Sequence, residues 1–270
     1  MYEEYFGMKN LPFTRDVPAN RLYESSSMAD ALGRLCYAAD RQLFVVVTAD
    51  SGCGKSTLIR KLSAALPSES YILLYLSDSK LTPRWFYKGM LDQLGVESRY
   101  YRGDAKRQLQ KEIEIIRGVR RKKVVCVLDE AHLLERETIE EFRFLLNYNF
   151  DSMSPMALVL VGQSELWDKL KLQRYAAVRQ RIDINCVLPH LERYETEQYI
   201  KSHLAYSECP QQEIFTERAI DDIYKETTGI PRLINRFCEK SLMYAAQQQK
   251  RLIDEHIVRY VAENEMLSGV

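Results

Sequence analysis

The sequence predicts an α/β fold: a parallel five-stranded sheet flanked by helices, followed by a smaller domain made only of helices. Short, continuous apolar runs recur through the first two thirds of the chain, with helix-like segments between them. Such runs are typical of strands that are buried on both faces of a parallel sheet. Beyond Leu188-Pro189 the segments have helical periodicity only. We therefore expect an α/β core at 1–188 and an all-helical domain at 189–270.

Each element follows from a local pattern. The chain opens with an irregular stretch and a helix-like segment at 27–41, and we assign residues 1–40 to the core as its N-terminal segment. The apolar runs predict five strands, at 43–48, 71–76, 124–128, 157–162 and 182–187. The helical domain is predicted to hold four helices, at 192–206, 216–228, 231–249 and 254–265.

Composition excludes several classes of protein. Among 270 residues, 38 are Lys or Arg and 38 are Asp or Glu, so the net charge is zero and any DNA-binding surface has to be a local patch. The six cysteines form no C-x-x-C pair, which argues against a metal or disulfide scaffold and predicts a reduced, cytoplasmic protein. No apolar run approaches the roughly 20 residues of a membrane helix, so we expect no membrane association.

A glycine-rich segment follows the first predicted strand. Thr48 to Thr57 read T-A-D-S-G-C-G-K-S-T, the order of strand, turn and helix start that a P-loop needs. Gly52 and Gly54 let backbone N–H groups turn towards phosphate oxygens, Lys55 supplies a positive charge, and Ser56 can ligate Mg²⁺. Ala49 stands where the usual pattern has its first glycine. We predict a nucleotide phosphate site formed by Ala49, Asp50, Ser51, Gly52, Cys53, Gly54, Lys55, Ser56 and Thr57.

Two adjacent carboxylates, Asp129 and Glu130, follow the apolar run 124–128. In a Walker-B arrangement Asp129 would hold Mg²⁺ and Glu130 would act as general base on the attacking water. The alternative is a buried strand that ends in a solvated acidic turn, but a P-loop upstream favours the functional interpretation. Asp-Glu-Ala-His also occurs in a helicase class that needs a second RecA-like domain, for which the helical remainder leaves no room.

Gln163 ends the predicted strand 157–162. Its amide could sense the γ-phosphate or place water, or it could simply satisfy a turn, and the sequence leaves both interpretations open.

Arg179 and Arg181 precede the last predicted strand. An arginine at this edge could reach the γ-phosphate of a neighbouring subunit as an arginine finger. We favour this role over two solvated arginines, with Arg181 slightly preferred to Arg179.

Arg232 follows Gly229-Ile230-Pro231, in which the glycine ends one helix and the proline suits the first turn of the next. A phosphate contact by Arg232 is favoured over a plain exposed arginine at a helix–turn–helix.

Three basic residues share a spacing of four on one predicted helix: Lys80, Arg84 and Lys88. Aromatic residues, including Trp85 and Tyr87, lie between them, and the combination could follow a DNA backbone. The alternative is a solvated helical face over the sheet. The basic run Arg117–Lys123 is interpreted as a solvated helix end.

In this order, these motifs resemble the AAA+ ATPases over nearly the whole chain. Within that superfamily the sequence looks like the ExeA-like group, which is close to the transposition ATPases of the TnsC, TniB and MuB type. The segments that carry this closer resemblance are Tyr5-Phe6-Gly7, Pro12-Phe13, Leu22-Tyr23, Gly162-Gln163-Ser164-Glu165-Leu166 and Arg179-Gln180-Arg181-Ile182.

The resemblance implies roles for individual positions, with ATP and Mg²⁺ as cofactors. Lys55 and Ser56 would bind phosphate and Mg²⁺, and Asp129 and Glu130 would be the Walker-B pair. Further positions would be sensor 1 at Gln163, the arginine finger at Arg181 or Arg179, sensor 2 at Arg232, and the adenine side at Pro12 and Phe13. Many AAA+ proteins have Asn or Thr at sensor 1, whereas glutamine is typical of the ExeA-like group.

The resemblance also implies a function. A transposition helper would form a ring or helical homo-oligomer on double-stranded DNA and recruit or stimulate a transposase. The alternatives are an ExeA-like secretion-associated ATPase and a nucleotide-dependent switch that acts on a protein partner. ExeA-type proteins carry an added membrane segment and a wall-binding domain that this sequence lacks, and we therefore expect the DNA role.

Overall fold

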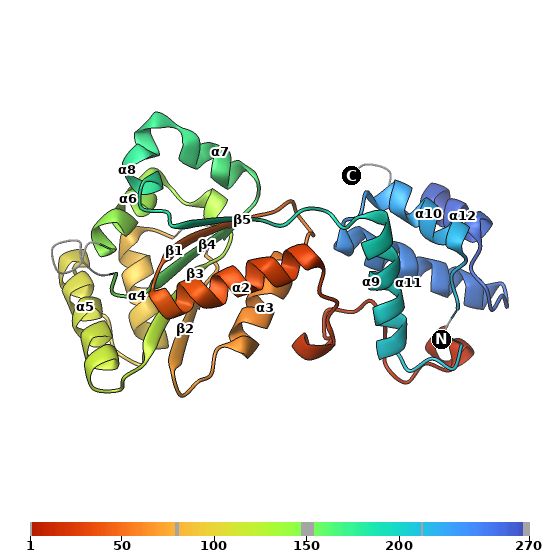
Figure 1. Ribbon diagram of the computed structural model, residues 1–270, viewed down its shortest axis with the longest axis horizontal. Helices are drawn as coiled ribbons and strands as arrows, with labels where there is room; N and C mark the ends of the chain where they lie inside the picture. The colour runs from red at the N-terminus through yellow and green to blue at the C-terminus, as the bar shows by residue number, and fades with distance from the viewer. Residues whose placement is uncertain (1, 79–80, 147–153, 212, 267–270) are drawn as a thin grey trace. The chain divides into compact units, whose positions relative to one another are not determined.

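The computed structural model describes residues 2–78, 81–146, 154–211 and 213–266. It divides into two compact units (Figure 1). The sheet unit comprises Met28–Ser51 and Leu58–Leu188, and the helical unit comprises Met1–Ser27, Gly52–Thr57 and Pro189–Val270.

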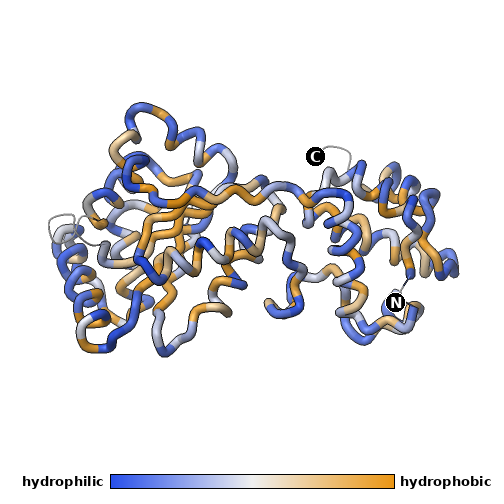
Figure 2. The backbone as a smooth tube through the Cα atoms, viewed as in Figure 1, coloured by the Kyte–Doolittle hydropathy of each residue, from blue (hydrophilic) through white to orange (hydrophobic). Residues whose placement is uncertain are grey.

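The sheet unit contains a five-stranded sheet with the order β2-β3-β4-β1-β5, and every pairing between neighbours is parallel. The strands are β1 Phe44–Thr48, β2 Tyr71–Leu76, β3 Lys123–Leu128, β4 Ala157–Gly162 and β5 Ile184–Val187. β1 and β4 are buried along their whole length, which explains their continuous apolar sequence (Figure 2). The predicted α/β fold is confirmed, and each strand lies within two residues of its predicted bounds.

Helices flank this sheet on both faces (Figure 1). They are α2 Ser26–Arg41, α3 Lys55–Ala65, α4 Pro83–Gln93, α5 Arg102–Gly118, α6 Arg136–Leu145, α7 Glu165–Lys171 and α8 Ala176–Arg179, with short 3₁₀ turns at Ala131–Leu133 and Gln173–Tyr175. Thr82 caps α4 by accepting from the Trp85 N–H, and Pro83 occupies its first turn. Phe86 on α4 packs edge-on against Phe142 on α6, so these helices share one core with the strands.

The helical unit contains α1 Tyr2–Phe6, the 3₁₀ turn Ala19–Arg21, α9 Arg193–Tyr206, α10 Glu217–Thr227, α11 Pro231–Gln247 and α12 Glu255–Asn264. Its four longer helices lie within two residues of the predicted ranges. Thr216 and Asp254 cap α10 and α12 through their side-chain oxygens. Gly229 has a φ of +78°, and a Cβ there would lie 1.9 Å from the Leu191 carbonyl oxygen. Only glycine fits this turn before α11.

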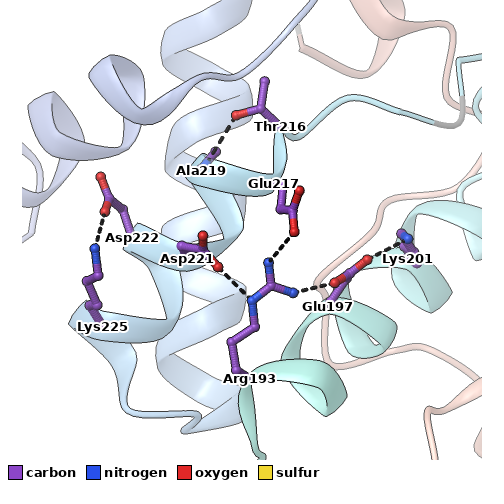
Figure 3. Close-up of polar contacts among 9 residues, drawn as sticks. All are labelled: Arg193, Glu197, Lys201, Thr216, Glu217, Ala219, Asp221, Asp222 and Lys225. Atoms are coloured by element: carbon purple, nitrogen blue, oxygen red, sulfur yellow. Dashed lines mark hydrogen bonds and ion pairs between the residues drawn. The ribbon is translucent and has the colours of Figure 1, made fainter.

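An ion-pair cluster around Arg193 joins α9 to α10 (Figure 3). The Arg193 Nε lies 2.7 Å from Asp221, its Nη1 pairs with Glu197, and its Nη2 lies 4.0 Å from Glu217. Glu197 also pairs with Lys201 at 2.7 Å. A planar guanidinium suits such a set of carboxylates, because its donors point in several directions at once.

The N-terminal residues pack differently from our assignment of 1–40 to the core. Residues 1–27 belong to the helical unit, where Tyr2, Phe6 and Phe13 are buried. The Phe13 ring stacks on His203 of α9 at 5.2 Å, and the Phe13 N–H donates to His203 Nδ1 at 3.2 Å. The aromatic residues of this stretch therefore complete the apolar core of the helices.

Candidate functional site

The carboxyl ends of three neighbouring strands bring the predicted catalytic motifs to one edge of the sheet. Ala49 leaves β1, Asp129 leaves β3, and Gln163 leaves β4, which lies between them. The Ala49 N–H donates to the Gly162 carbonyl at 3.2 Å, and the Ser164 hydroxyl donates to Asp50 at 2.6 Å. The start of the glycine-rich loop is thus fixed to the end of β4.

The loop itself has the backbone that a phosphate site needs. Gly52 and Gly54 have φ values of +90° and +92°, and α3 begins immediately afterwards at Lys55, which is buried. Ala49 is buried and does not have a positive φ, so its backbone does not require the glycine of the usual pattern. The positive φ values turn successive N–H groups to one side, and these features fit a nucleotide phosphate chain.

Arg232 contacts this loop within the helical unit. Its backbone N–H donates to the Gly52 carbonyl at 3.3 Å, and a Cβ on Gly52 would lie 2.8 Å from the Arg232 Cβ. Gly52 is therefore required twice, for its backbone angle and for the close approach of α11.

Asp129 is buried, and both of its carboxylate oxygens accept hydrogen bonds. The Tyr75 hydroxyl donates to Oδ2 at 2.6 Å, and the Glu130 N–H donates to Oδ1 at 2.8 Å. Burial, together with the hydrogen bond to Asp129, raises the pKa of Tyr75 far above its ordinary value, so the phenol keeps its proton. The sequence analysis missed Tyr75, whose position depends on its pairing with Val127 across β2 and β3.

Glu130 has the left-handed backbone of φ +53° and ψ +32°, which is unusual for a residue other than glycine. Its carboxylate is 45% exposed and lies 3.5 Å from Nδ1 of His132. The Nε2 atoms of His132 and Gln163 lie 3.2 Å apart, and the Gln163 N–H donates to His132 Nδ1 at 3.5 Å. His132 therefore lies between the predicted base and the predicted sensor, a position that the sequence did not reveal.

The two candidate finger arginines have different surroundings. Arg179 donates from Nη1 to the carbonyls of Leu170 and Lys171, at 3.1 Å and 2.6 Å, and so satisfies the end of α7. Arg181 lies beyond the end of α8 and lines a cavity at the amino edge of the sheet.

Two of the three predicted DNA-binding residues lie on α4, and Lys80 lies outside the described residues. Arg84 stacks over Tyr100 at 4.3 Å, and Lys88 lies 4.8 Å from the centre of the Trp85 ring. Trp85 is 51% exposed and Tyr100 is 70% exposed. We call Arg84, Trp85, Lys88 and Tyr100 the α4 patch.

In the part of the chain that the structure describes, no three His, Cys, Asp or Glu side chains gather as metal ligands. Mg²⁺ commonly needs only one or two protein ligands when phosphates supply others, and Ser56 and Asp129 fit that chemistry.

Across the same described ranges, no helix combines the length and apolar character needed to cross a bilayer.

Part of the chain matches the model of a known protein family. A family model described as an AAA domain matches residues 38–170, which include the glycine-rich loop, Asp129-Glu130 and Gln163. General secretion pathway protein A of Aeromonas hydrophila is 31% identical over 252 residues, covering 91% of this chain and 45% of that protein. The chain thus spans less than half the length of this relative.

Similar solved structures extend over the helical unit as well. Cdc6p from Pyrobaculum aerophilum has a TM-score of 0.68 at 16% identity, covering 99% of this chain and 72% of that one. The Aeropyrum pernix ORC1 protein in complex with DNA has a TM-score of 0.66 at 13% identity, covering 94% and 68%. These likenesses concern the fold alone. Residues 38–170 therefore match the model of an AAA domain, and the chain has the fold of the AAA+ superfamily of P-loop ATPases.

Proposed function

We propose that this chain binds ATP with Mg²⁺ at the carboxyl edge of its sheet and hydrolyses it. The observation that carries the proposal is the group Asp129, Glu130, His132 and Gln163, which lies at the strand ends beside the start of the glycine-rich loop. A buried carboxylate next to an exposed one, with polar side chains beside the second, is the arrangement expected for a metal ligand beside a general base.

Each residue then has a task. Backbone N–H groups of the loop, together with Lys55, bind the phosphates, while Ser56 and Asp129 hold Mg²⁺. When bound, the ion neutralises negative charge on the phosphate oxygens. Glu130 accepts the proton of the attacking water at its carboxylate, and His132 lies 3.5 Å from that carboxylate and contacts Gln163.

We further propose that the active form is a homo-oligomer, a ring or a helical filament. The finger that stabilises the γ-phosphate of a neighbour is Arg181 or Arg179, with Arg181 slightly preferred because it lies nearer to the start of β5. Arg232 contacts phosphate from the helical unit, and Pro12 and Phe13 contribute to the adenine side.

Two outputs for this ATPase are supported by different observations. A secretion-associated ATPase that acts on a protein complex is supported by the 31% identity to general secretion pathway protein A. A transposition helper that assembles on duplex DNA and recruits a transposase is supported by the α4 patch, where two cations lie on exposed aromatic rings.

One set of assays tests the ATPase and separates its outputs. Lys55→Ala is expected to abolish ATP binding, and loss of hydrolysis without loss of binding would contradict its assigned role.

Duplex DNA binding at low salt is then measured with ATP for the wild type, Arg84→Ala/Lys88→Ala and the control Arg99→Ala/Lys111→Ala. Weakening only in the α4 variant supports the transposition output. Absence of DNA binding by the wild type removes that output and leaves the protein-directed one.

A further inference from the structure

A cavity of about 760 Å³ lies at the amino edge of the sheet, at the opposite ends of the strands from Asp129 and Gln163. It is built where three strands begin. The segment Asp40–Phe44 leads into β1, Arg121–Lys123 leads into β3, and Arg181 and Asp183 precede β5. All of these residues belong to the sheet unit. The basic run that the sequence analysis interpreted as a solvated helix end therefore lines a concave site.

The lining of this cavity is strongly positive. Among the described residues that line the cavity, two are acidic, Asp40 and Asp183, and six are basic: Arg41, Arg117, Arg121, Lys122, Lys123 and Arg181. The excess of four positive charges is local, because the whole chain has a net charge of zero. Like charges gathered in a concave surface raise the positive potential there and attract anions.

The charges of the two carboxylates are already subtracted in this excess of four. Asp40 pairs with Lys123 and lies 3.9 Å from Arg41. Asp183 accepts a hydrogen bond from the Phe44 N–H at 2.8 Å. The charge that remains over the cavity comes from the other basic residues.

Two of those other residues donate to neutral groups. Lys122 donates to the Ser68 carbonyl at 2.8 Å, and Arg117 donates to the carbonyls of Ser154 and Pro155 at 3.2 Å and 3.4 Å. Such contacts leave their positive charge uncompensated. Arg121 has a φ of +53°, a left-handed backbone conformation that is energetically unfavourable for an arginine. This residue forms a sharp turn after α5, directly before Lys122.

We propose that this cavity is a binding site for the phosphate groups of a polyanion, supplied by a free nucleotide or by a nucleic-acid backbone. Several closely spaced negative charges are needed to balance the cluster, and a single carboxylate supplies too few. Guanidinium groups bind phosphate oxygens through paired N–H donors, and most of the basic residues here are arginines. The volume lies within the range of small-molecule sites, of about 300–1,000 Å³.

The test uses the full chain with Lys55→Ala, so that the glycine-rich loop does not contribute to phosphate binding. The probes are tripolyphosphate, followed by calorimetry, and a short DNA duplex, followed by fluorescence anisotropy over a range of salt concentrations. The site variant adds Arg41→Ala, Arg121→Gly and Lys122→Ala, where glycine suits the positive φ. The matched control adds Arg99→Ala, Lys111→Ala and Arg174→Ala, which remove three exposed positive charges outside the cavity lining.

We expect the site variant, and not the control, to bind about tenfold more weakly or worse. For DNA, the slope of the logarithm of the binding constant against the logarithm of salt concentration should become less steep. The change should correspond to about three fewer counterions released, roughly one for each charge removed. Binding of tripolyphosphate alone identifies a nucleotide as the source, and binding of DNA alone identifies a nucleic acid.

Three results would overturn the proposal: no binding of either probe at low salt, equal loss in the control variant, or equal binding of poly-glutamate. Thermal melting of both variants checks that each is folded. ATP hydrolysis is not a readout here, so failure of this proposal leaves the proposed ATP hydrolysis untouched.

Discussion

Replacing Glu141 by Gln should destabilise the sheet unit measurably, although the two side chains have nearly the same shape. Glu141 lies on α6 and its side chain is only 3% exposed. It accepts hydrogen bonds from the Tyr87 hydroxyl on α4 at 2.5 Å, from Lys106 on α5 at 2.9 Å, and from Arg102 on α5. One carboxylate thus joins three helices that share a core with the strands.

The size of the effect follows from these three contacts. A hydrogen bond that involves a charged group contributes about 1.5–3 kcal/mol, whereas a neutral one contributes about 0.5–1.5 kcal/mol. Glutamine keeps one acceptor oxygen but loses the charge, and its amide N–H₂ faces cationic donors. We expect the free energy of unfolding to fall by about 2–4 kcal/mol, close to the roughly 3–5 kcal/mol of breaking a buried ion pair.

Urea unfolding of the wild type and Glu141→Gln measures this difference, with the exposed Glu114→Gln as the control. The pH dependence supplies a second check. Burial raises the pKa of Glu141, but the donors from Tyr87, Lys106 and Arg102 outweigh it, and the folded pKa lies below the ordinary value. The stabilisation should therefore be complete above about pH 4.3, the unfolded pKa, and should be lost as the pH falls towards the folded pKa. A difference below about 0.5 kcal/mol at neutral pH would refute the reasoning.

Three further outcomes are expected. His132→Ala should lower kcat by about tenfold or more while the KM for ATP stays within about twofold, because His132 positions Glu130 and contacts no substrate; a change in KM alone would contradict that role. Gly52→Ala should lower the free energy of unfolding, measured in urea, by about 2 kcal/mol or more, because Gly52 has a φ of +90° and its added Cβ would lie 2.8 Å from the Arg232 Cβ. Gly103→Ala, where a Cβ would meet open space, should not lower it. Burial lowers the pKa of His203 to about 4, so stability should fall as the pH drops from about 6.5 towards 4, and a His203→Gln variant should lack this loss.

The sequence predicted the sheet well because its strands are buried on both faces. Continuous apolar runs such as Val124–Leu128 are strong local signals. The order of the strands was not predicted, and the structure shows that it brings Ala49, Asp129 and Gln163 to one edge. The bounds of β5 were less accurate. Ile182 is apolar because it packs on the core, and β5 begins only at Ile184, after the Asp183 N–H bonds to Phe44.

The residues that the sequence could not predict depend on partners that are far away in the chain. Tyr75 reaches Asp129 only through the register of β2 on β3, and Glu141 finds its donors on two other helices. Phe13 was expected on the adenine side, in the N-terminal segment 1–40 of the core, but it stacks on His203, which lies 190 positions further on. No periodicity within a short window encodes such pairings.

The central claim is that the carboxyl edge of this sheet hydrolyses ATP with Glu130 as the base. Single-turnover hydrolysis, measured together with ATP affinity, tests it directly by comparing Glu130→Gln with the wild type. With Glu130 as the base, the variant should bind ATP within about threefold of the wild type and hydrolyse it about 10²–10⁴-fold more slowly, the usual contribution of a general base. Hydrolysis by Glu130→Gln at the wild-type rate, or no hydrolysis by the wild type under assembling conditions, would contradict it.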